Sequence, residues 1–340
     1  MNYRTIGNTG LSISEIGFGT GGTAGLMIHG TREEQREAVR RALDLGIKNF
    51  DESPDYGDGV SESSLGSILK ELGVRPLITT KVEVRAENLG DIAGHIERSV
   101  EQSLRRLQVE YVDIVQIHNG PVVQRANLQG RDYRVLSLDD YLNPGGAIEG
   151  LDRITKAGKT RYIGFICRGD DGPEVKQLLD TGRFHLINLI YTLLNPTAAS
   201  ASQGASGASP DFGGVIDYAQ QRGVGVAVYS PLAGGLLTDH GLQGGEPHRL
   251  SRPPGGAATG RVSEARARAR AQAARFAFLS QPSETTLAQA AIRFILMNAG
   301  VTTVLGGFSD IAQLEEACAA VDQPPLSDEA MARVEAVWGL

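Results

Sequence analysis

Three titratable side chains stand at the ends of short apolar runs rich in β-branched residues. Asp51, Lys81 and His118 each end such a run, and Tyr56 follows the first of them after a short turn. Neighbouring strand ends of a closed parallel barrel meet at one mouth. If these runs are barrel strands, the four side chains converge on a single site.

These four residue types fit one kind of chemistry. An isolated tyrosine, with a pKa of about 10, is a poor acid–base catalyst at neutral pH. A charged Lys81 would lower the pKa of Tyr56, and Asp51 would hold that lysine charged and oriented. His118 could donate a hydrogen bond to a carbonyl oxygen. The quartet therefore suits proton transfer to an oxygen whose carbon accepts hydride, and the hydride must come from a cofactor. Each residue alone also has a structural explanation, so the prediction rests on their shared position at strand ends.

The elements that would position these residues alternate along the chain. Eight runs are predicted as buried strands, namely residues 13–18, 47–51, 77–81, 112–118, 161–166, 186–191, 224–229 and 301–305. Helical periodicity fills the gaps, and the sequence Thr31-Arg32-Glu33-Glu34 predicts a capping box at the start of the first helix. Eight such units favour a (β/α)8 TIM barrel. A doubly wound open sheet remains the alternative, because periodicity does not reveal closure.

The length of the chain fits a single barrel domain with insertions. A barrel takes about 250 residues, and the 340 residues of this chain leave room for insertions. We expect a single domain over residues 1–340, with long loops at 119–146, 194–211 and 238–275. Each loop follows a predicted strand and so belongs to the C-terminal face, where barrel enzymes build their sites.

Composition excludes several classes of protein. The net charge is −7, from 33 basic and 40 acidic residues, which argues against a binder of nucleic acid or of anionic membranes. Two cysteines cannot form a disulfide scaffold and predict a reducing compartment, so a cytoplasmic location is expected. No apolar run approaches membrane-spanning length. The expected partner is a small molecule, and the chain could be a monomer or a homo-oligomer.

A glycine motif in the first predicted strand is a weaker signal. Residues 17–22, Gly-Phe-Gly-Thr-Gly-Gly, satisfy G-x-G-x-x-G. A dinucleotide fingerprint should open a helix at once and be followed by an acid about 20 residues on. Here the helix is predicted only near Thr31, and the next strand-ending acid is Asp51. We therefore interpret the motif as a tight, close-packed turn.

Taken together, several segments resemble the aldo-keto reductase family over nearly the whole chain. Residues 46–57, Gly-Ile-Lys-Asn-Phe-Asp-Glu-Ser-Pro-Asp-Tyr-Gly, followed by Ser61-Glu62 and Leu65-Gly66, are similar to the family's Asp and Tyr segment. Further matching segments are Thr80-Lys81, residues 111–118 (Tyr-Val-Asp-Ile-Val-Gln-Ile-His) and residues 228–237 (Val-Tyr-Ser-Pro-Leu-Ala-Gly-Gly-Leu-Leu). The resemblance implies a (β/α)8 barrel that binds NAD(P)(H) across its mouth and interconverts a carbonyl compound and its alcohol. It assigns the proton-donor role to Tyr56, tuned by Lys81 and Asp51, with His118 orienting the substrate.

The resemblance also implies a set of cofactor contacts. These are Gly19, Thr20, Asp51, Cys167, Asn188, Tyr229, Ser230, Leu232, Gly234, Gly307, Ser309, Asp310 and Gln313. Two of them depart from the family pattern. Ile166-Cys167 stands where Ser-Asn usually holds the nicotinamide carboxamide, and Asn188 stands where a glutamine is usual. A thiol hydrogen-bonds weakly, so carboxamide anchoring is expected to differ, and Cys167 is interpreted as a buried packing residue.

The resemblance by itself favours NADP(H), whereas the local charge of this sequence favours NAD(H), which we expect by a small margin. Family members that bind NADP usually read its 2′-phosphate with Lys or Arg near the last barrel helix, but none occurs between Arg293 and Arg333. Asp310 lies in this stretch and would repel a phosphate. The alternative source of cations is an arginine-rich run after the seventh strand, made of Arg261, Arg266, Arg268 and Arg270, which is more typical of a solvated helix face.

Substrate and alternative functions are less well defined. The loops nearest the mouth offer Met27, Asn119 and Tyr133 as substrate contacts, and their polar character favours a hydroxylated or sugar-like carbonyl compound. One alternative is a cofactor-binding regulatory or sensor subunit on the same barrel with little turnover. Another is a metal-dependent hydrolase, but the chain has no H-x-H or H-E-x-x-H motif. No metal is therefore expected.

Overall fold

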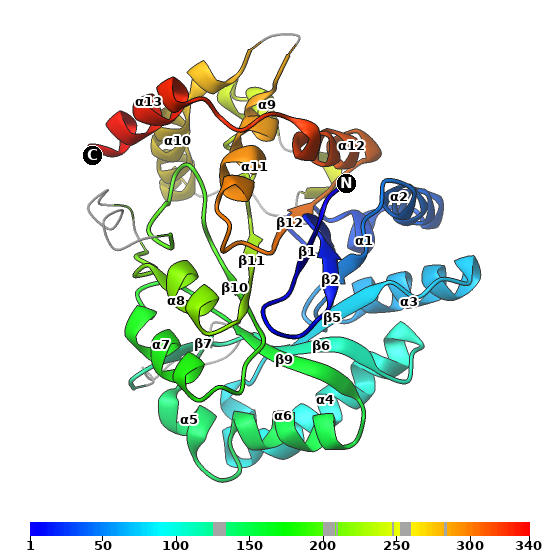
Figure 1. Cartoon of the computed structure of the whole chain (residues 1–340). Helices are drawn as coiled ribbons and strands as arrows, with labels where there is room; N and C mark the ends of the chain where they lie inside the picture. The colour runs from blue at the N-terminus through cyan, green and yellow to red at the C-terminus, as the bar shows by residue number, and fades with distance from the viewer. Residues whose placement is uncertain (125–133, 200–207, 209, 247, 252–259, 282–283) are drawn as a thin grey trace.

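The computed structural model shows eight parallel strands closed into a barrel (Figure 1). It describes residues 1–340 apart from 125–133, 200–207, 209, 247, 252–259 and 282–283. The barrel strands are β3 (Ile16–Gly19), β4 (Asn49–Asp51), β5 (Leu77–Val82), β6 (Val112–Ile117), β9 (Thr160–Ile166), β10 (Leu186–Leu189), β11 (Gly225–Tyr229) and β12 (Thr303–Gly307). They neighbour one another in chain order, and β12 pairs with β3. The predicted barrel is confirmed, and the open sheet is excluded.

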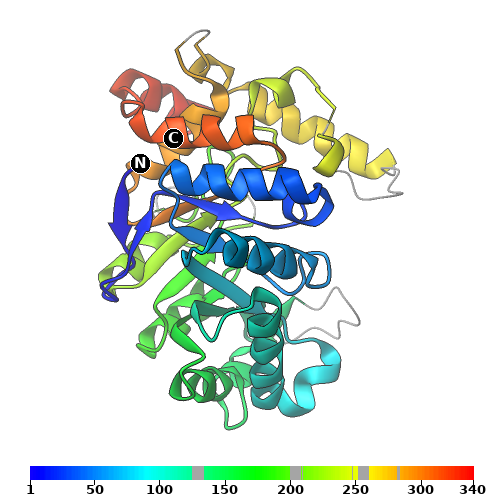
Figure 2. The same ribbon diagram turned by 90° about the vertical axis from the view of Figure 1, so that its right-hand side faces the viewer.

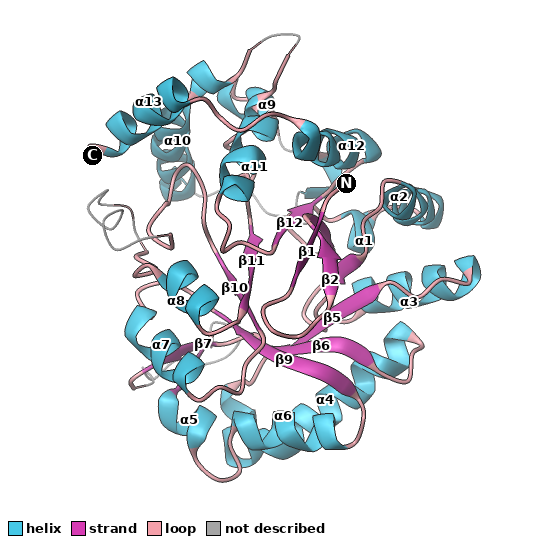
Figure 3. Ribbon diagram, in the orientation of Figure 1, coloured by secondary structure: helices cyan, strands magenta, loops and turns pink. Residues whose placement is uncertain are grey.

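Helices form a ring around the strands (Figure 3). They are α1 (Leu26–His29), α2 (Arg32–Asp44), α3 (Val60–Leu72), α4 (Ile92–Leu107), α5 (Leu138–Leu142), α6 (Ala147–Lys156), α7 (Gly172–Asp180), α8 (Val215–Gln221), α9 (Asp239–Leu242), α10 (Gly260–Ala274), α11 (Leu287–Met297), α12 (Ile311–Ala319) and α13 (Asp328–Trp338). Short 3-10 helices lie at Ala86–Asp91, Arg249–Ser251, Ala277–Leu279 and Ala320–Asp322. The capping box predicted at Thr31 and Glu34 is confirmed. None of the helices in the described part of the chain is long and apolar enough to cross a membrane.

The helix α3 does not stand out in the sequence, because its Val-Ser-Glu-Ser-Ser start is polar. Tertiary packing determines it instead. Gly66 lies so close to α4 that an added Cβ would overlap the backbone of Leu107. The facing side of α3 buries Leu65, Ile68 and Leu69 against the core. This close approach fixes α3 against α4.

The first predicted strand is divided in the structure. The sequence predicts one strand over residues 13–18, but Ile13 belongs to β2 (Ser12–Ser14), which pairs with β1 (Tyr3–Thr5) in an antiparallel hairpin. Figure 2 shows this hairpin at one end of the barrel. Ile6 and Ile13 pack with the barrel residues Ile114, Leu186, Ala227 and Leu305. Since β10 and β11 begin near this cluster, the hairpin covers the N-terminal end of the barrel, opposite the catalytic candidates.

The glycine motif lies in and directly after β3. An added Cβ at Gly17 would overlap the side-chain amide of Asn49 on the neighbouring strand, so this glycine permits close packing inside the barrel wall. Only the four-residue helix α1 follows nearby, and its N-cap, Gly25, has φ of 78°. The interpretation as a tight turn therefore fits the structure better than a dinucleotide fingerprint.

Candidate active site

The structure brings all four predicted side chains together. Asp51 ends β4, Lys81 lies in β5 and His118 directly follows β6. The register places Asp51 beside Thr79 and Lys81 beside Gln116, so the three strands deliver their side chains to one side of the mouth. Tyr56 lies in the turn between β4 and α3. Its ring meets the ring of His118 edge-on, at a centroid distance of 6.2 Å and an angle of 82°.

Lys81 is the buried centre of the cluster. Its side chain is only 2% exposed, and Nζ donates to Asp51 Oδ1, to the Glu52 carbonyl oxygen at 2.8 Å and to Tyr56 Oη at 3.4 Å. Burial opposes the charge on Lys81, but Asp51 and Tyr56 outweigh it, so the pKa of Lys81 is raised. The lysine is therefore a fixed cation beside the phenol.

The pKa of Tyr56 differs from the sequence prediction, in which Lys81 lowers the pKa of this phenol. Burial raises the pKa instead, and the nearby carboxylate of Asp51 adds to the rise, so the lowering by Lys81 is outweighed. The effect of Lys81 has the predicted sign, but the net pKa of Tyr56 is raised because burial, which the sequence does not reveal, is the larger contribution. With its pKa raised, Tyr56 is protonated at neutral pH, which suits an acid that gives up its proton.

Asp51 is held from the opposite side by amides. Asn188 Nδ2 donates to Asp51 Oδ2 at 3.3 Å, and Gln116 Nε2 donates to Asn188 Oδ1 at 2.8 Å. Asn188 is buried, so both of its polar atoms are engaged inside the barrel. Each of these groups keeps one further hydrogen-bonding capacity, a second amide hydrogen on Nδ2 and a second lone pair on Oδ1.

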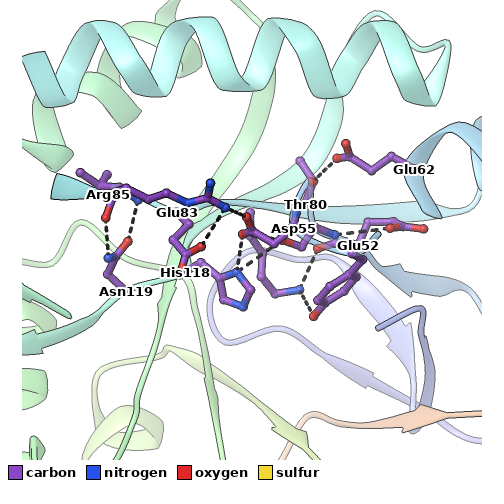
Figure 4. Close-up of polar contacts among 12 residues, drawn as sticks. Glu52, Asp55, Glu62, Thr80, Glu83, Arg85, His118 and Asn119 are labelled. Carbon is purple, nitrogen blue, oxygen red and sulfur yellow. Dashed lines mark hydrogen bonds and ion pairs between the residues drawn. The ribbon is translucent and has the colours of Figure 1, made fainter. Parts of the chain in front are cut away.

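His118 has a partner that the sequence prediction missed. Its Nδ1 lies 3.2 Å from Asp55 Oδ2, and Asp55 Oδ1 accepts a hydrogen bond from Arg85 at 2.8 Å (Figure 4). Burial lowers the pKa of His118 to about 4, against the opposing effect of Asp55. The signal for Asp55 was available, since this residue directly precedes Tyr56 in the matched segment. Nothing in the sequence, however, shows that its side chain turns toward His118.

Two buried glutamates lie behind the catalytic cluster. Glu52 accepts a hydrogen bond from Ser61 Oγ at 3.0 Å, and burial together with the charge of Glu62 raises the pKa of Glu52 to about 8. The Glu62 carboxylate accepts hydrogen bonds from Thr80 Oγ1 at 2.6 Å and from Arg106 Nε at 2.7 Å. These contacts connect β4, α3, β5 and α4, so they hold the turn that carries Tyr56 (Figure 4).

The predicted cofactor residues lie around the remaining strand ends. Cys167 directly follows β9, and Tyr229 ends β11, where its hydroxyl donates to the Cys167 carbonyl oxygen at 3.2 Å. The Cys167 thiol is buried, and burial raises its pKa well above the usual value. It therefore behaves as a packing residue, and its side chain does not replace an amide donor.

A neighbouring arginine offers a donor that Cys167 lacks. Arg168 follows Cys167 and donates through Nη2 to the His118 carbonyl oxygen. Its Nε is buried and has no hydrogen-bond partner among the residues that the structure describes. A buried N–H of this kind favours a ligand acceptor beside it. The rim between Cys167 and Tyr229 is thus compatible with the amide group of a nicotinamide.

The turn after β11 exposes backbone and hydroxyl groups. Ser230 and Ala233 have positive φ angles of 52° and 49°, and Gly234 continues the turn with 65°. The turn is closed by hydrogen bonds from Ala233 N to Ser230 O at 2.9 Å and from Leu237 N to Leu232 O at 3.1 Å. Of the three cofactor contacts predicted in this turn, Ser230 and Gly234 are exposed and Leu232 is half-buried. All three are therefore open to contact with a ligand.

The residues after β12 form the start of α12. Asp310 is its N-cap and accepts from Gln313 N at 2.9 Å, while Ser309 Oγ donates to the Ala24 carbonyl oxygen at 2.8 Å. Gly307 is exposed at the end of β12. The imidazole Nε2 of His248 lies 3.8 Å from Asp310 Oδ2. The negative charge predicted at this position is therefore in place on the rim.

Two predicted cofactor contacts, Gly19 at the end of β3 and Thr20 directly after it, have contacts within the fold. Thr20 is buried, and its Oγ1 donates to the Asp51 carbonyl oxygen at 2.9 Å. Gly19 pairs with Asp51 in the parallel ladder. Both residues therefore support the strand end that carries Asp51, and Gly19, half-buried, is the more open of the two.

Two of the predicted substrate contacts, Asn119 and Met27, have buried side chains. Asn119 is fully buried, and its amide donates to the Val84 carbonyl oxygen at 2.9 Å and accepts from Val84 N at 2.8 Å. Met27 is buried in the hydrophobic core. Both side chains are thereby committed to packing within the fold. Tyr133 lies outside the described residues.

Comparisons with known proteins agree with this arrangement of a polar strand-end cluster on a closed barrel. The sequence model of the Aldo/keto reductase family matches residues 15–339, and the chain belongs to that family of oxidoreductases. Within the described residues, no group of three His, Cys, Asp or Glu side chains could hold a metal ion.

Individual relatives extend the likeness over most of the chain. An L-galactose dehydrogenase of Arabidopsis thaliana is 28% identical, with 99% of this chain and 94% of that protein aligned. An L-glyceraldehyde 3-phosphate reductase of Escherichia coli O157:H7 is 28% identical over 98% of this chain and 92% of its own. The solved aldo-keto reductase AKR11C1 from Bacillus halodurans, in its holo form, superposes with a TM-score of 0.72 at 24% identity. It covers 99% of this chain and 96% of its own, which shows the shared fold.

Proposed function

We propose that the protein is an NAD(P)-dependent oxidoreductase that interconverts a hydroxylated aldehyde or ketone and its alcohol, with Tyr56 as the acid–base residue. One observation carries the proposal: Lys81 holds a protonated phenol and the Asp51 carboxylate together at the ends of adjacent strands. The named activities of the relatives, which concern L-galactose and L-glyceraldehyde 3-phosphate, support the hydroxylated substrate class.

In the reducing direction, the proposed proton path is short. A bound nicotinamide would supply the hydride that reaches the carbonyl carbon. The oxygen of that carbonyl gains negative charge, and Tyr56 donates its proton to it. Lys81 stabilises the phenolate that remains, since its Nζ lies 3.4 Å from Tyr56 Oη. Asp51 keeps Lys81 charged during the step.

Most of the residues that would hold the cofactor lie at the ends of β9–β12 or directly after these strands, and Gly19 lies at the end of β3. We propose that Tyr229 faces the nicotinamide ring, and that Arg168 Nε and the exposed turn at Ser230–Gly234 contact its polar groups. The positions Gly19, Gly307, Ser309 and Gln313 complete the rim. The negative charge of Asp310 and the absence of Lys or Arg between Arg293 and Arg333 favour NAD(H) over NADP(H).

The cysteines indicate the cellular location, and the length of the chain indicates its domain organisation. Cys167 and Cys318 are both free and buried, as expected in a reducing compartment, so we propose a cytoplasmic enzyme. We also propose that residues 1–340 act as one barrel unit on a small-molecule substrate.

The test is a titration of the purified protein with NADH and, separately, with NADPH, followed by the fluorescence of the reduced nicotinamide. We expect both to bind, NADH more tightly, and we expect added glyceraldehyde to oxidise the bound NADH. Binding without turnover of any carbonyl compound would instead support a cofactor-binding regulatory subunit. Failure of both nicotinamides to bind would overturn the proposal.

A further inference from the structure

The residue next to Tyr56 fixes the orientation of the His118 ring. Asp55 Oδ2 lies 3.2 Å from His118 Nδ1, and Asp55 Oδ1 accepts from Arg85 Nη2 at 2.8 Å. Ser53 Oγ lies 3.3 Å from each of Asp55 Oδ2 and His118 Nδ1. Figure 4 shows one ring nitrogen of His118 directed at this group and the other directed away from it.

These contacts determine which ring nitrogen carries the proton. Burial opposes the ionisation of Asp55, but its interactions with His118, followed by the charge of Arg85, outweigh burial and lower the pKa of Asp55 to about 2. An ionised carboxylate only accepts hydrogen bonds. The nitrogen facing it, Nδ1, must therefore be protonated. Ser53 has a single hydroxyl hydrogen, which satisfies the same carboxylate oxygen without displacing the Nδ1 proton.

The surroundings keep the imidazole neutral. Burial lowers the pKa of His118 to about 4, and the cations Lys81 and Arg168 act in the same direction, while Asp55 opposes them. Glu83 lies 3.5 Å from Arg85 and faces Asp55, and burial together with the Asp55 charge raises the pKa of Glu83 to about 7. With one proton only, and that on Nδ1, the Nε2 atom of His118 carries a lone pair.

A lone pair at Nε2 selects its hydrogen-bond partner. A carbonyl oxygen has no hydrogen to offer, so it cannot bond to this atom, whereas a hydroxyl group can. Among the described residues, none hydrogen-bonds to Nε2. We propose that Asp55 is a positioning residue that makes His118 an acceptor, and that Nε2 binds the hydroxyl on the carbon next to the reacting carbonyl. The enzyme would then select 2-hydroxy aldehydes and ketones.

The inferred preference for 2-hydroxy substrates rests on the proposed function. The position of the His118 proton, in contrast, can be measured without turnover. Nitrogen chemical shifts of ¹⁵N-histidine-labelled protein distinguish a protonated Nδ1 from a protonated Nε2, and His118→Gln identifies the His118 signals. In the wild type we expect Nδ1 protonated. In Asp55→Asn, Arg85 can donate only to the amide oxygen, which turns the amide hydrogens toward His118. We therefore expect the proton to move to Nε2.

Two results would overturn the proposal that Asp55 places the His118 proton on Nδ1. One is a wild-type His118 protonated at Nε2, and the other is an Asp55→Asn spectrum with the wild-type tautomer. Glu83→Gln is the matched control, because a glutamine amide can keep the hydrogen bond that Glu83 makes with Asp55 and, like Glu83, does not touch the imidazole. We expect Glu83→Gln to leave the His118 signals as they are in the wild type.

The preference for 2-hydroxy substrates is tested by comparing lactaldehyde with propanal, which lacks the 2-hydroxyl. For a hydrogen bond of ordinary strength we expect wild-type kcat/KM to favour lactaldehyde by about 10-fold. Asp55→Asn should lower this preference at least about 3-fold, largely through better use of propanal, because Nε2–H can donate to a carbonyl oxygen. Glu83→Gln should keep it. Equal wild-type use of both aldehydes, or an unchanged preference in Asp55→Asn, would contradict the proposal. If the wild type reduces neither, the proposed function fails and the inferred substrate preference fails with it, while the tautomer measurement still decides the role of Asp55.

Discussion

The half of the mouth built by β4–β6 differs from the half built by β9–β12 in how its polar groups are paired. On the first, Lys81 has three oxygen partners and His118 is held by Asp55. On the second, Cys167 is a buried thiol, Ser230 is exposed and Arg168 Nε has no partner among the described residues. Groups that act on a reacting atom must be preorganised, whereas groups that bind a cofactor can obtain their partners from it. The difference fits the division that we propose, into a catalytic half at β4–β6 and a cofactor half at β9–β12.

The largest effect is expected from Tyr56→Phe on the catalytic half. The phenyl ring keeps the packing but cannot donate a proton, so kcat for carbonyl reduction should fall about 10²–10⁴-fold. Steady-state kinetics with an aldehyde measures the loss, and the affinity for NADH should stay within about 2-fold of wild type. If Tyr56→Phe kept its activity, the proton would come from another group. The division of the mouth into a catalytic and a cofactor half would then lose its basis.

The second prediction concerns the buried ion pair. Lys81→Met leaves the Asp51 carboxylate buried without its cation, and breaking such a pair typically costs about 3–5 kcal/mol in the free energy of unfolding. Urea denaturation measures this cost. The double variant Lys81→Met with Asp51→Asn should be less destabilised than Lys81→Met alone, because no uncompensated charge remains. Equal destabilisation of the two would show that packing, and not charge, determines the effect.

The smallest effect is expected from Asp310→Asn on the cofactor half. Asparagine keeps the N-cap of α12 but removes the charge. The ratio of the NADPH and NADH dissociation constants should fall about 3-fold, as is usual for one partly exposed charge. Asp91→Asn, the same change at the N-cap of α4, is the control and should leave the ratio unchanged. An unchanged ratio in Asp310→Asn would mean that Asp310 does not face the 2′-phosphate.

The sequence predicted the catalytic half better than the cofactor half. Asp51, Lys81 and His118 could be placed because each ends an apolar run, and a strand end leaves little freedom of position. The partner of His118 could not be found in this way, since the direction of the Asp55 side chain depends on Arg85, which lies 30 residues further along the chain. The same limit explains α3, whose position depends on the contact between Gly66 and Leu107. Contacts that join distant segments decide these details.

The buried carboxyl group of Glu52 has a consequence for folding itself. In the unfolded chain this group ionises with a pKa near the ordinary 4.5, whereas in the folded protein burial and Glu62 raise the pKa to about 8. At neutral pH the chain therefore takes up a proton as it folds. The contribution of Glu52 to stability is complete below pH 4.5 and is lost as the pH rises through about 8. The heat absorbed on unfolding at neutral pH consequently includes the heat of protonating the buffer, and it changes from one buffer to another.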